Sequence, residues 1–594
     1  MPKEKVMTKN DIINATEPAM AEDKKLALAD KAAKPPFKTI SNGIAILIEK
    51  EDKSYYEWFC SHLEIVADTR DSNNRSWGRL LMVIDRDGKK HEWAMPMEML
   101  ASEGREYRRV LLSMGLEIAP GAFGAKALHQ YISTTKPKLK ARCVDKVGWH
   151  KACYVMPETT YGDTEGERVL LQLPGSLPAY EHIGTLEDWN KHIGQYCIGN
   201  SRLMLAVCIA LASPLLYLVS EESTGIHFTG QSSSGKTTAL HIAASVYGSR
   251  VKSWRTTDNA AENLALGSND NLLCLDELSQ VDDKVVYNVV YMLGNGQQKS
   301  RMNSNTTLQT ERYWRLLFIS SGEMGLSEKL KEGNKKWKAG QGVRFIEISA
   351  DAGGGYMMFE DVHSFGDGNI FSQHLRHASE NYRGTLGASF LEKITQDPEA
   401  IKASLQEKIK IWEHEQIDDN DDGQVKRVGR KFALISAAGE LAIELGLVPW
   451  ATNDVTEAIV KCFNNWIVRR GGDDASEIIE GMKQVASFFE LHIVRFAYIS
   501  DEPATIQYVN NQLGFKIHDD GGSTEYYATT SGFEEMCRGY DKSTIARALI
   551  DRGYMTGSKN KTSVSKQLKG QKKQRFYYFS ADNIHKLREF IAKL

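Results

Sequence analysis

The sequence predicts a multidomain α/β protein, and three features of the chain support this fold class. The chain has 594 residues, too many for a single hydrophobic core. Short apolar runs between turn residues fill residues 37–185, which predicts a β-rich module. Residues 186–364 alternate apolar runs with helical patterns, and helical periodicity dominates residues 365–474. We therefore expect a disordered tail at 1–36, these three segments, and a small last domain at 475–594.

The composition limits what the protein can be. Hydrophobic residues make up 42% and charged residues 25% of the chain, which is ordinary for a soluble protein. The formal net charge of −3 excludes a chain that is basic throughout, so any surface that binds nucleic acid must be local. The eight cysteines include no C-x-x-C pair, which argues against a zinc finger or a disulfide framework and predicts a cytoplasmic protein.

One uncharged segment, Leu203–Val219, is nearly long enough to cross a bilayer. Pro214 interrupts it, and a core built around a parallel sheet needs one or two buried helices. We therefore expect a buried core helix and no membrane contact, with a membrane span as the alternative.

Residues Gly230–Thr237 match the pattern G-x-x-x-x-G-K-[ST] in full. The apolar run Ile226–Thr229 is typical of a strand, and Thr238–Tyr247 is typical of a helix. This order of strand, loop and helix suits a phosphate cradle, because backbone N–H groups and the helix N-terminus then surround the anion. A chance glycine- and serine-rich loop is the alternative. The motif predicts a P-loop that binds a nucleoside triphosphate, which we take to be ATP.

The residue types in this loop have distinct roles in such a site. Gly230 and Gly235 allow backbone angles that other residues avoid. Lys236 can reach the β- and γ-phosphates, and the Thr237 hydroxyl can hold Mg²⁺. We assign contacts with the nucleotide to Gly230, Gln231, Ser232, Ser233, Ser234, Gly235, Lys236, Thr237 and Thr238.

A second apolar run, Asn271–Glu277, ends in two carboxylates. In P-loop enzymes this is the Walker B strand, so Asp276 would hold the Mg²⁺ shell and Glu277 would orient and deprotonate the attacking water. A buried strand that ends in acidic residues by chance is the alternative. A glutamate directly after the aspartate favours a hydrolase over a small-molecule kinase.

Trp314–Glu323 is another apolar run with polar residues at its end. A strand beside Walker B would bring Ser320 or Ser321 near the γ-phosphate, as at the sensor-1 position of AAA+ ATPases, and we assign the role to Ser320. An ordinary Ser-Gly turn is the alternative.

Two groups of arginines are candidates for acting on the nucleotide. Arg344 directly precedes a predicted strand, where an arginine finger would act on the ATP of a neighbouring subunit. A surface or ion-paired arginine is the alternative. Arg427 and Arg430 open a predicted helix at Val425–Leu445, and either is equally well explained as a second sensor or as an exposed helical residue.

The segment Tyr291–Arg312 contains Gly294 and Gly296 and predicts a hairpin that carries Lys299 and Arg301. Such a hairpin projects into the pore of ring helicases, where cations contact DNA phosphates. An ordinary charged surface hairpin is the alternative.

Taken together, these motifs resemble an AAA+-type helicase family of phages, plasmids and integrative elements that is catalogued as a domain of unknown function. The resemblance covers about residues 40–470. It implies a ring-forming ATPase similar to superfamily III helicases, although fold alone does not establish unwinding. The strings that carry it are Gly148–His150, Gly230–Thr238, Leu275–Leu278, Ser321–Glu323 and Arg430–Ala442.

The last domain has a pattern of its own. Gly532–Cys537 and Asp541–Asp551 predict two short helices, and Gly553–Phe579 contains six lysines and one arginine but no acidic residue. Two helices followed by a basic hairpin are typical of a winged helix. We assign DNA contacts to Lys569, Lys572 and Lys573, with binding of a protein as the alternative.

The predicted architecture is thus a P-loop AAA+-like ATPase core with a helical lid, between a β-rich N-terminal module and a C-terminal winged helix. The predicted function is an ATP- and Mg²⁺-dependent helicase or translocase that forms a ring, taken to be a hexamer. Single-stranded or forked DNA would be its partner, in the replication of a mobile element. The alternative of a different class is an ATP-gated assembly or phage-defence ATPase without processive unwinding. A nucleotide kinase is disfavoured by Glu277.

Overall fold

The computed structural model divides the chain into two compact units. The first comprises Met1–Asp145 and Thr164–Gln172, and the second comprises Lys146–Asp163 and Leu173–Leu594. Residues 1–34 of the predicted tail lie outside the described residues, as do Lys299 and Arg301. The structure describes residues 35–50, 53–173, 179–255, 257–281, 283–298, 311–332, 342–470, 476–499, 509–518, 522–557 and 561–593.

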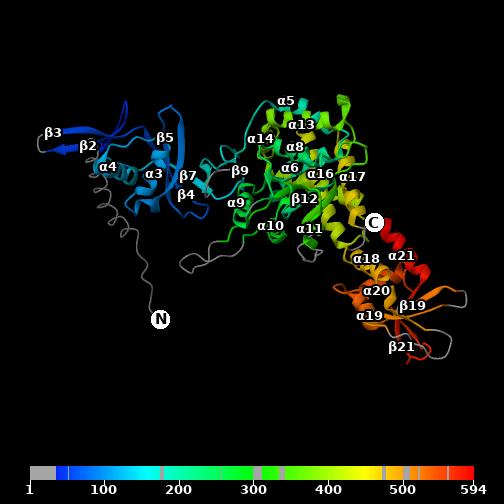
Figure 1. Ribbon diagram of the computed structural model, residues 1–594. Coiled ribbons are helices and arrows are strands. Elements are labelled where there is room, and N and C mark those ends of the chain that lie inside the picture. The colour runs from blue at the N-terminus through cyan, green and yellow to red at the C-terminus, as the bar shows by residue number, and fades with distance from the viewer. Residues whose placement is uncertain are drawn as a thin grey trace, which may run out of the picture. The chain divides into compact units, whose positions relative to one another are not determined.

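The described residues of the first unit form two β-sheets and two α-helices. Its antiparallel sheet β1-β2-β3 includes the long β2–β3 hairpin (Figure 1), and its mixed sheet has the order β11-β7-β4-β5-β6. The elements are β1 (Phe37–Ile40), β2 (Gly43–Lys50), β3 (Lys53–Cys60), β4 (Leu63–Arg70), β5 (Gly78–Ile84), β6 (Lys90–Pro96), η1 (Met97–Leu100), α3 (Arg105–Ser113), α4 (Gly121–Thr134), β7 (Leu139–Val144) and β11 (Arg168–Leu171).

Alternation of buried and exposed residues along β4 turns Leu63 and Ile65 toward a core that they share with Leu81 and Leu128. β5 lies inside the sheet and is almost wholly buried. Gly104, at φ +71°, separates the short 3₁₀ helix η1 from α3, so this part of the chain does not form one continuous helix.

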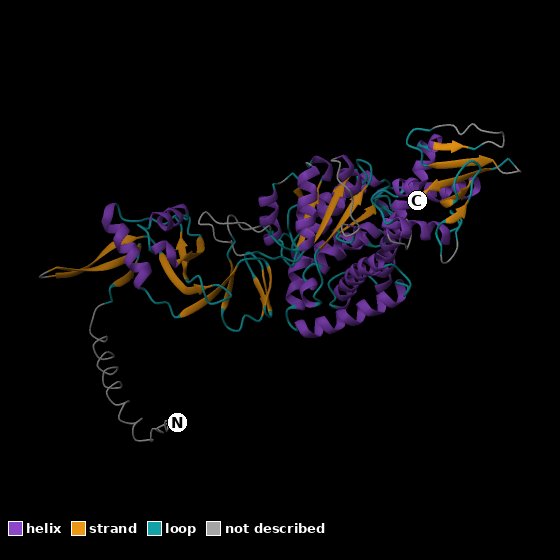
Figure 2. Ribbon diagram, turned by 90° about the horizontal axis from the view of Figure 1, so that it is seen from below, coloured by secondary structure: helices purple, strands orange, loops and turns teal. Residues whose placement is uncertain are grey.

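The second unit is built around a parallel sheet with the order β13-β14-β15-β12-β16. Its carboxyl ends share one edge, and helices lie on both faces (Figure 2). The strands are β12 (Thr224–Thr229), β13 (Lys252–Ser253), β14 (Leu272–Asp276), β15 (Leu317–Gly322) and β16 (Phe345–Ser349). The described helices before and between them are α5 (Leu186–His192), α6 (Ser201–Ala212), α7 (Leu215–Leu218), α8 (Lys236–Ser245), α9 (Asp258–Gly267), α10 (Asp283–Asn295) and α11 (Leu326–Glu332).

The two faces of this sheet have different cores. α6 and α8 contact one another and β15 on one face. On the other face, residues of α9, α10 and α11 form a cluster with Leu273, Leu275, Phe318 and Phe345 of the sheet. α6 is buried along its whole length, and α7 follows Pro214. Within the described residues, no helix is long and apolar enough to cross a membrane.

A small antiparallel sheet, β10-β9-β8, packs beside the residues that precede β14. The backbone N–H of Trp149 donates to Asp270 Oδ2 (3.1 Å), and the Tyr154 hydroxyl donates to the Asp270 carbonyl (2.5 Å). Gly148 has φ +107°, and a Cβ there would clash with Asp270, which explains the glycine. Burial raises the pKa of Asp270 to about 6. The strands are β8 (Gly148–His150), β9 (Cys153–Val155) and β10 (Thr160–Gly162).

The helical region follows β16. Its longest helix, α16, agrees closely with the helix predicted at Val425–Leu445. Arg430 pairs with Glu221 and Glu413. Glu221 lies just before β12, at the edge of the sheet opposite to the glycine-rich loop, so the structure does not place Arg430 at its own P-loop. The helices are α13 (Gly368–Asn381), α14 (Thr385–Ile394), α15 (Pro398–Gln416), α16 (Gly423–Glu444) and α17 (Thr452–Arg470).

The C-terminal region has a sheet of its own, with the order β17-β18-β19-β21-β20. Its core includes Val485, Phe489, Phe533, Leu549 and Phe579 from both helices and strands. The elements are α18 (Ser476–Leu491), β17 (Phe496–Tyr498), β18 (Gly514–His518), β19 (Thr524–Thr529), α19 (Thr530–Met536), α20 (Lys542–Asp551), β20 (Val564–Lys566), β21 (Gln574–Ser580) and α21 (Ala581–Lys593).

Candidate functional site

The glycine-rich loop connects the end of β12 to the start of α8, as the motif predicts. Gly235 precedes α8 with φ +93°, and Ser233 also has positive φ. A Cβ on Gly230 would press against Ala350, and one on Gly235 would press against Met358 and Phe359. Both the backbone conformation and close packing therefore favour glycine at position 235, and close packing favours it at position 230.

Lys236 is 6% exposed and bends back over its own loop. Its ammonium donates to the carbonyls of Gly230 (2.7 Å) and Gln231 (2.6 Å) and to Ser234 Oγ (3.1 Å). Burial lowers the pKa of Lys236, and the charges of Glu323, Glu277 and Asp276 act in the opposite direction. The lysine is thus held at the loop with its three donors on neutral oxygens.

Asp276 ends β14 beside the first turn of α8. Its Oδ1 accepts hydrogen bonds from the hydroxyl of Ser321 and from the backbone N–H of Glu277 (3.1 Å), and the Thr237 hydroxyl lies 3.5 Å away. A hydroxyl and a carboxylate side by side at a helix N-terminus fit Mg²⁺, which takes oxygen ligands and otherwise keeps waters and phosphates. Thr237 and Asp276 are the residues that could hold the ion.

Glu277 has an uncommon backbone conformation, with φ 64° and ψ 67°. This left-handed conformation is unfavourable in free energy for any residue other than glycine, and such outliers cluster at functional sites. The Ser279 hydroxyl donates to Glu277 Oε2 (3.1 Å), and Lys329 of α11 donates to the Ser279 carbonyl (3.2 Å). The side chain of Glu277 is therefore held by the turn that follows β14.

The two serines considered for the sensor position point to opposite faces of the sheet. Ser320 is fully buried, donates to His227 Nδ1 (2.9 Å) and accepts from Trp254 Nε1 (2.7 Å). It therefore faces the side of the sheet covered by α9–α11, whereas Ser321 contacts Asp276 on the side of α8. Successive residues of a strand point to opposite faces, so only one of the two serines can reach the phosphate site.

Arg344 precedes β16, and its carbonyl accepts from the backbone N–H of Gly225 at the start of β12 (2.8 Å). It thus lies at the amino-terminal edge of the sheet, opposite to the glycine-rich loop. Its side-chain stem packs against Gly294 of α10.

The ends of the segment that contains Lys299 and Arg301 are joined by a bridge between Gln297 and Tyr313.

Two further parts of the chain lie against the loop and were not found by sequence reasoning. The backbone N–H of Met358 donates to the Ser234 carbonyl (3.2 Å), and Ser372 of α13 shares a hydrogen bond with Thr238 (2.6 Å). The segment Ala350–Phe359 carries no nucleotide-binding signature of its own, because its place beside the loop results from the strand order of the sheet.

In the C-terminal region, Lys569, Lys572 and Lys573 are exposed on the turn between β20 and β21. Leu568 in the same turn is 3% exposed and packs into a core with Phe576, so the turn is anchored from within. The helix pair predicted before it is present as α19 and α20, with the Asp541 carboxylate capping α20 through the backbone N–H of Thr544 (2.8 Å).

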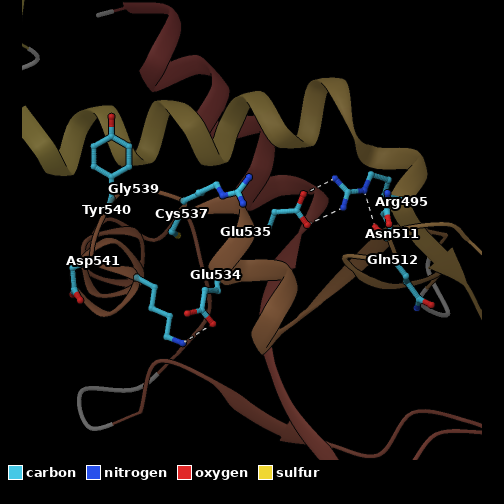
Figure 3. Close-up of a pocket in the computed structure, with 11 residues that line it drawn as sticks. Arg495, Asn511, Gln512, Glu534, Glu535, Cys537, Gly539, Tyr540 and Asp541 are labelled. Atoms are coloured by element: carbon cyan, nitrogen blue, oxygen red, sulfur yellow. Dashed lines mark hydrogen bonds and ion pairs between the residues drawn. The ribbon is translucent and has the colours of Figure 1, made fainter. Parts of the chain in front are cut away.

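A hollow of about 870 Å³ opens beside α19 and α20 (Figure 3). Four of its charged residues form two pairs: Arg495 makes two hydrogen bonds with Glu535, and Lys542 donates to Glu534 (3.2 Å).

Comparisons with known proteins agree with this architecture. A family model described as "Domain of unknown function (DUF927)" matches residues 37–313, and no curated protein matches the chain. A solved structure described as "SCCmec type IV Cch - active helicase" aligns with a TM-score of 0.69 at 16% identity, covering 94% of this chain and 99% of that chain. The NrS-1 C-terminal region aligns at 10% identity with a TM-score of 0.25, over 68% and 91% of the two chains. The first alignment shows a shared fold over nearly the whole length.

Proposed function

We propose that this protein is an ATP-dependent DNA helicase or translocase of a mobile genetic element that works as a ring, taken to be a hexamer. The observation that carries the proposal is the meeting of Lys236, Thr237, Asp276 and Ser321 at one edge of a parallel sheet. The fold that the chain shares with an active helicase supports it. The division into β-rich module, ATPase core, helical lid and winged helix belongs to the same proposal, as does a cytoplasmic location.

Each residue of the site has a role in hydrolysis. Lys236 would exchange its loop carbonyls for the β- and γ-phosphates, and Thr237 and Asp276 would hold Mg²⁺, which supplies neutralisation of phosphate charge when bound. Glu277 would orient the attacking water and accept its proton. We assign the sensor role to Ser321 in place of Ser320, because its hydroxyl lies on Asp276.

Arg344 would act on the ATP of a neighbouring subunit. Five residues of β16 separate it from the edge that bears the glycine-rich loop, which is about 16 Å of extended strand. Its side chain is too short to reach its own site over that span. An arginine finger would therefore require at least two subunits, which favours a ring.

Two basic surfaces would contact DNA. Lys299 and Arg301, outside the described residues, would lie on a hairpin in the pore, and the exposed turn with Lys569, Lys572 and Lys573 would be the wing of a winged helix. Both would contact phosphates and would therefore bind without sequence preference.

Negative-stain imaging with ATP and single-stranded DNA tests this proposal. We expect closed rings around a strand, together with ATP hydrolysis that DNA stimulates. Assembly that needs ATP but ignores DNA would contradict the helicase proposal and would favour an ATP-gated assembly module.

A further inference from the structure

The segment Ser321–Leu326 comprises the last two residues of β15 and the loop that leads to the start of α11, and it is bound at its start to both nucleotide motifs. The Ser321 hydroxyl donates to Asp276, and the carbonyl of Gly322 accepts from the backbone N–H of Gly230 (3.3 Å), the first residue of the glycine-rich loop. The side chain that follows, Glu323, is therefore delivered to the phosphate edge of the sheet.

The far end of this loop is held by His227 of β12. Its Nε2 lies 3.1 Å from the carbonyl of Met324, and a carbonyl only accepts, so Nε2 carries the proton. His227 Nδ1 then accepts from the Ser320 hydroxyl, which in turn accepts from Trp254 Nε1. This chain of hydrogen bonds runs from strand to strand on the face covered by α9–α11, and it holds the loop from that buried face.

Glu347 of β16 holds the same loop from a second direction. Its Oε1 accepts from the backbone N–H of Leu326 (2.6 Å), at the start of α11. A Cβ on Gly325 would clash with the Glu347 carboxylate, and a Cβ on Gly322 would press on His227. The loop is thus closely packed and cannot shift without breaking these contacts.

Within Ser321–Leu326, Glu323 alone has an exposed side chain, whereas its neighbours are buried or half-buried. Burial lowers the pKa of Lys236, and three carboxylates oppose this shift, Glu323 more than Glu277 and Asp276. A closely packed loop therefore presents one exposed carboxylate directly after the residues that bond to Asp276 and Gly230. Rigid support of this kind is what a functional group needs.

We propose that Glu323 is a further residue of the phosphate site and makes the site select nucleotide that is complexed with a divalent cation, with His227 as its positioning residue. The inference rests on the proposed function. A carboxylate beside the entering phosphates repels them, and a bound cation offsets that repulsion. Nucleotide without a cation would meet the full negative charge of the site.

The test compares the affinity of the full-length chain for ATP in Mg²⁺ and in EDTA by titration calorimetry. Glu323→Gln removes the charge and keeps the size, and Glu323→Asp is the matched control that keeps the charge. We expect Glu323→Gln to bind ATP more tightly than wild type in EDTA, by on the order of tenfold, and to bind it with nearly unchanged affinity in Mg²⁺. Glu323→Asp should behave as wild type under both conditions. An unchanged ratio of the two affinities in Glu323→Gln would overturn the inference.

His227→Asn keeps every charge of the phosphate site but removes the donor to Met324. We expect this variant to lose part of the selectivity for the Mg²⁺ complex of ATP. Its melting temperature serves as the control that it is folded. Full selectivity in a folded variant would refute the positioning role. A wild-type chain that binds no ATP under either condition, like Lys236→Ala, would contradict the proposed function itself rather than the assignment of Glu323.

Discussion

Ser320 and Ser321 are neighbours on β15, yet their hydroxyls serve opposite faces of the sheet. Ser321 donates to the Asp276 carboxylate at the phosphate site, and Ser320 joins His227 and Trp254 in a buried chain of hydrogen bonds. In the proposed function the same strand would supply one group for chemistry and one for support, and substitutions at the two positions should differ in kind.

Ser321→Ala should reduce ATP turnover by about 10²-fold or more, because a donor at the site of developing charge is lost, and should leave stability nearly unchanged. Ser320→Ala should destabilise the protein by about 1–3 kcal/mol, because buried partners lose a hydrogen bond. Steady-state turnover and urea unfolding measure the two effects. Equal turnover losses in both variants, at equal stability, would contradict the division.

Arg344→Ala should bind ATP normally and hydrolyse it poorly, with a loss on the order of 10³-fold. Mixing it with Lys236→Ala protein is the decisive measurement, since some interfaces then combine an intact loop with an intact arginine. Partial recovery of ATPase activity is expected. If ATPase activity does not recover in assemblies shown to exchange subunits, Arg344 has a structural role instead, through its packing against α10.

The local motifs were predictable from sequence, and the contacts between strands were not. Gly230–Thr237 and Asp276 lie where predicted, because each motif sits at the end of one apolar run. The sensor role was predicted for Ser320, whereas the serine that contacts Asp276 is Ser321, since a strand pattern does not reveal which of two adjacent serines faces a given helix. Glu323 and His227 act through a loop that β12, β15 and β16 hold together, and only the strand order brings them into contact.

Replacing Lys569, Lys572 and Lys573 by alanine should weaken DNA binding and reduce the slope of its salt dependence by roughly one unit per lost phosphate contact. ATPase activity on saturating DNA should survive. Replacing Lys299 and Arg301 should instead leave basal ATPase intact and reduce its stimulation by DNA.

Fluorescence anisotropy over a salt series, together with ATPase assays, separates the two surfaces. Lys393→Ala combined with Lys410→Ala, two exposed lysines of the helical region, is the control for loss of positive charge. The assignment fails if the wing variant loses turnover on saturating DNA while the hairpin variant behaves as wild type.

His227 should make stability depend on pH. Burial lowers its pKa from 6.5 to about 4, so the unfolded chain binds more protons between these values and stability falls as the pH drops through this window. Asp270, with its pKa raised to about 6, acts in the opposite sense, which makes comparison with a variant necessary. Between pH 7 and pH 5, His227 should lower the free energy of unfolding of the wild type by about 2 kcal/mol, and His227→Gln should lack this decrease. Identical pH dependence in thermal unfolding would contradict the buried neutral histidine.

Displacement of a strand from a forked DNA duplex tests the central claim most directly. Wild-type protein with ATP and Mg²⁺ should release the strand. Lys236→Ala should fail because it binds ATP weakly, and Glu277→Gln should bind ATP and the fork but release nothing, because only the water-orienting group is removed. Strand release by Glu277→Gln at the wild-type rate, or no release by wild-type protein that hydrolyses ATP on the same DNA, would contradict the account.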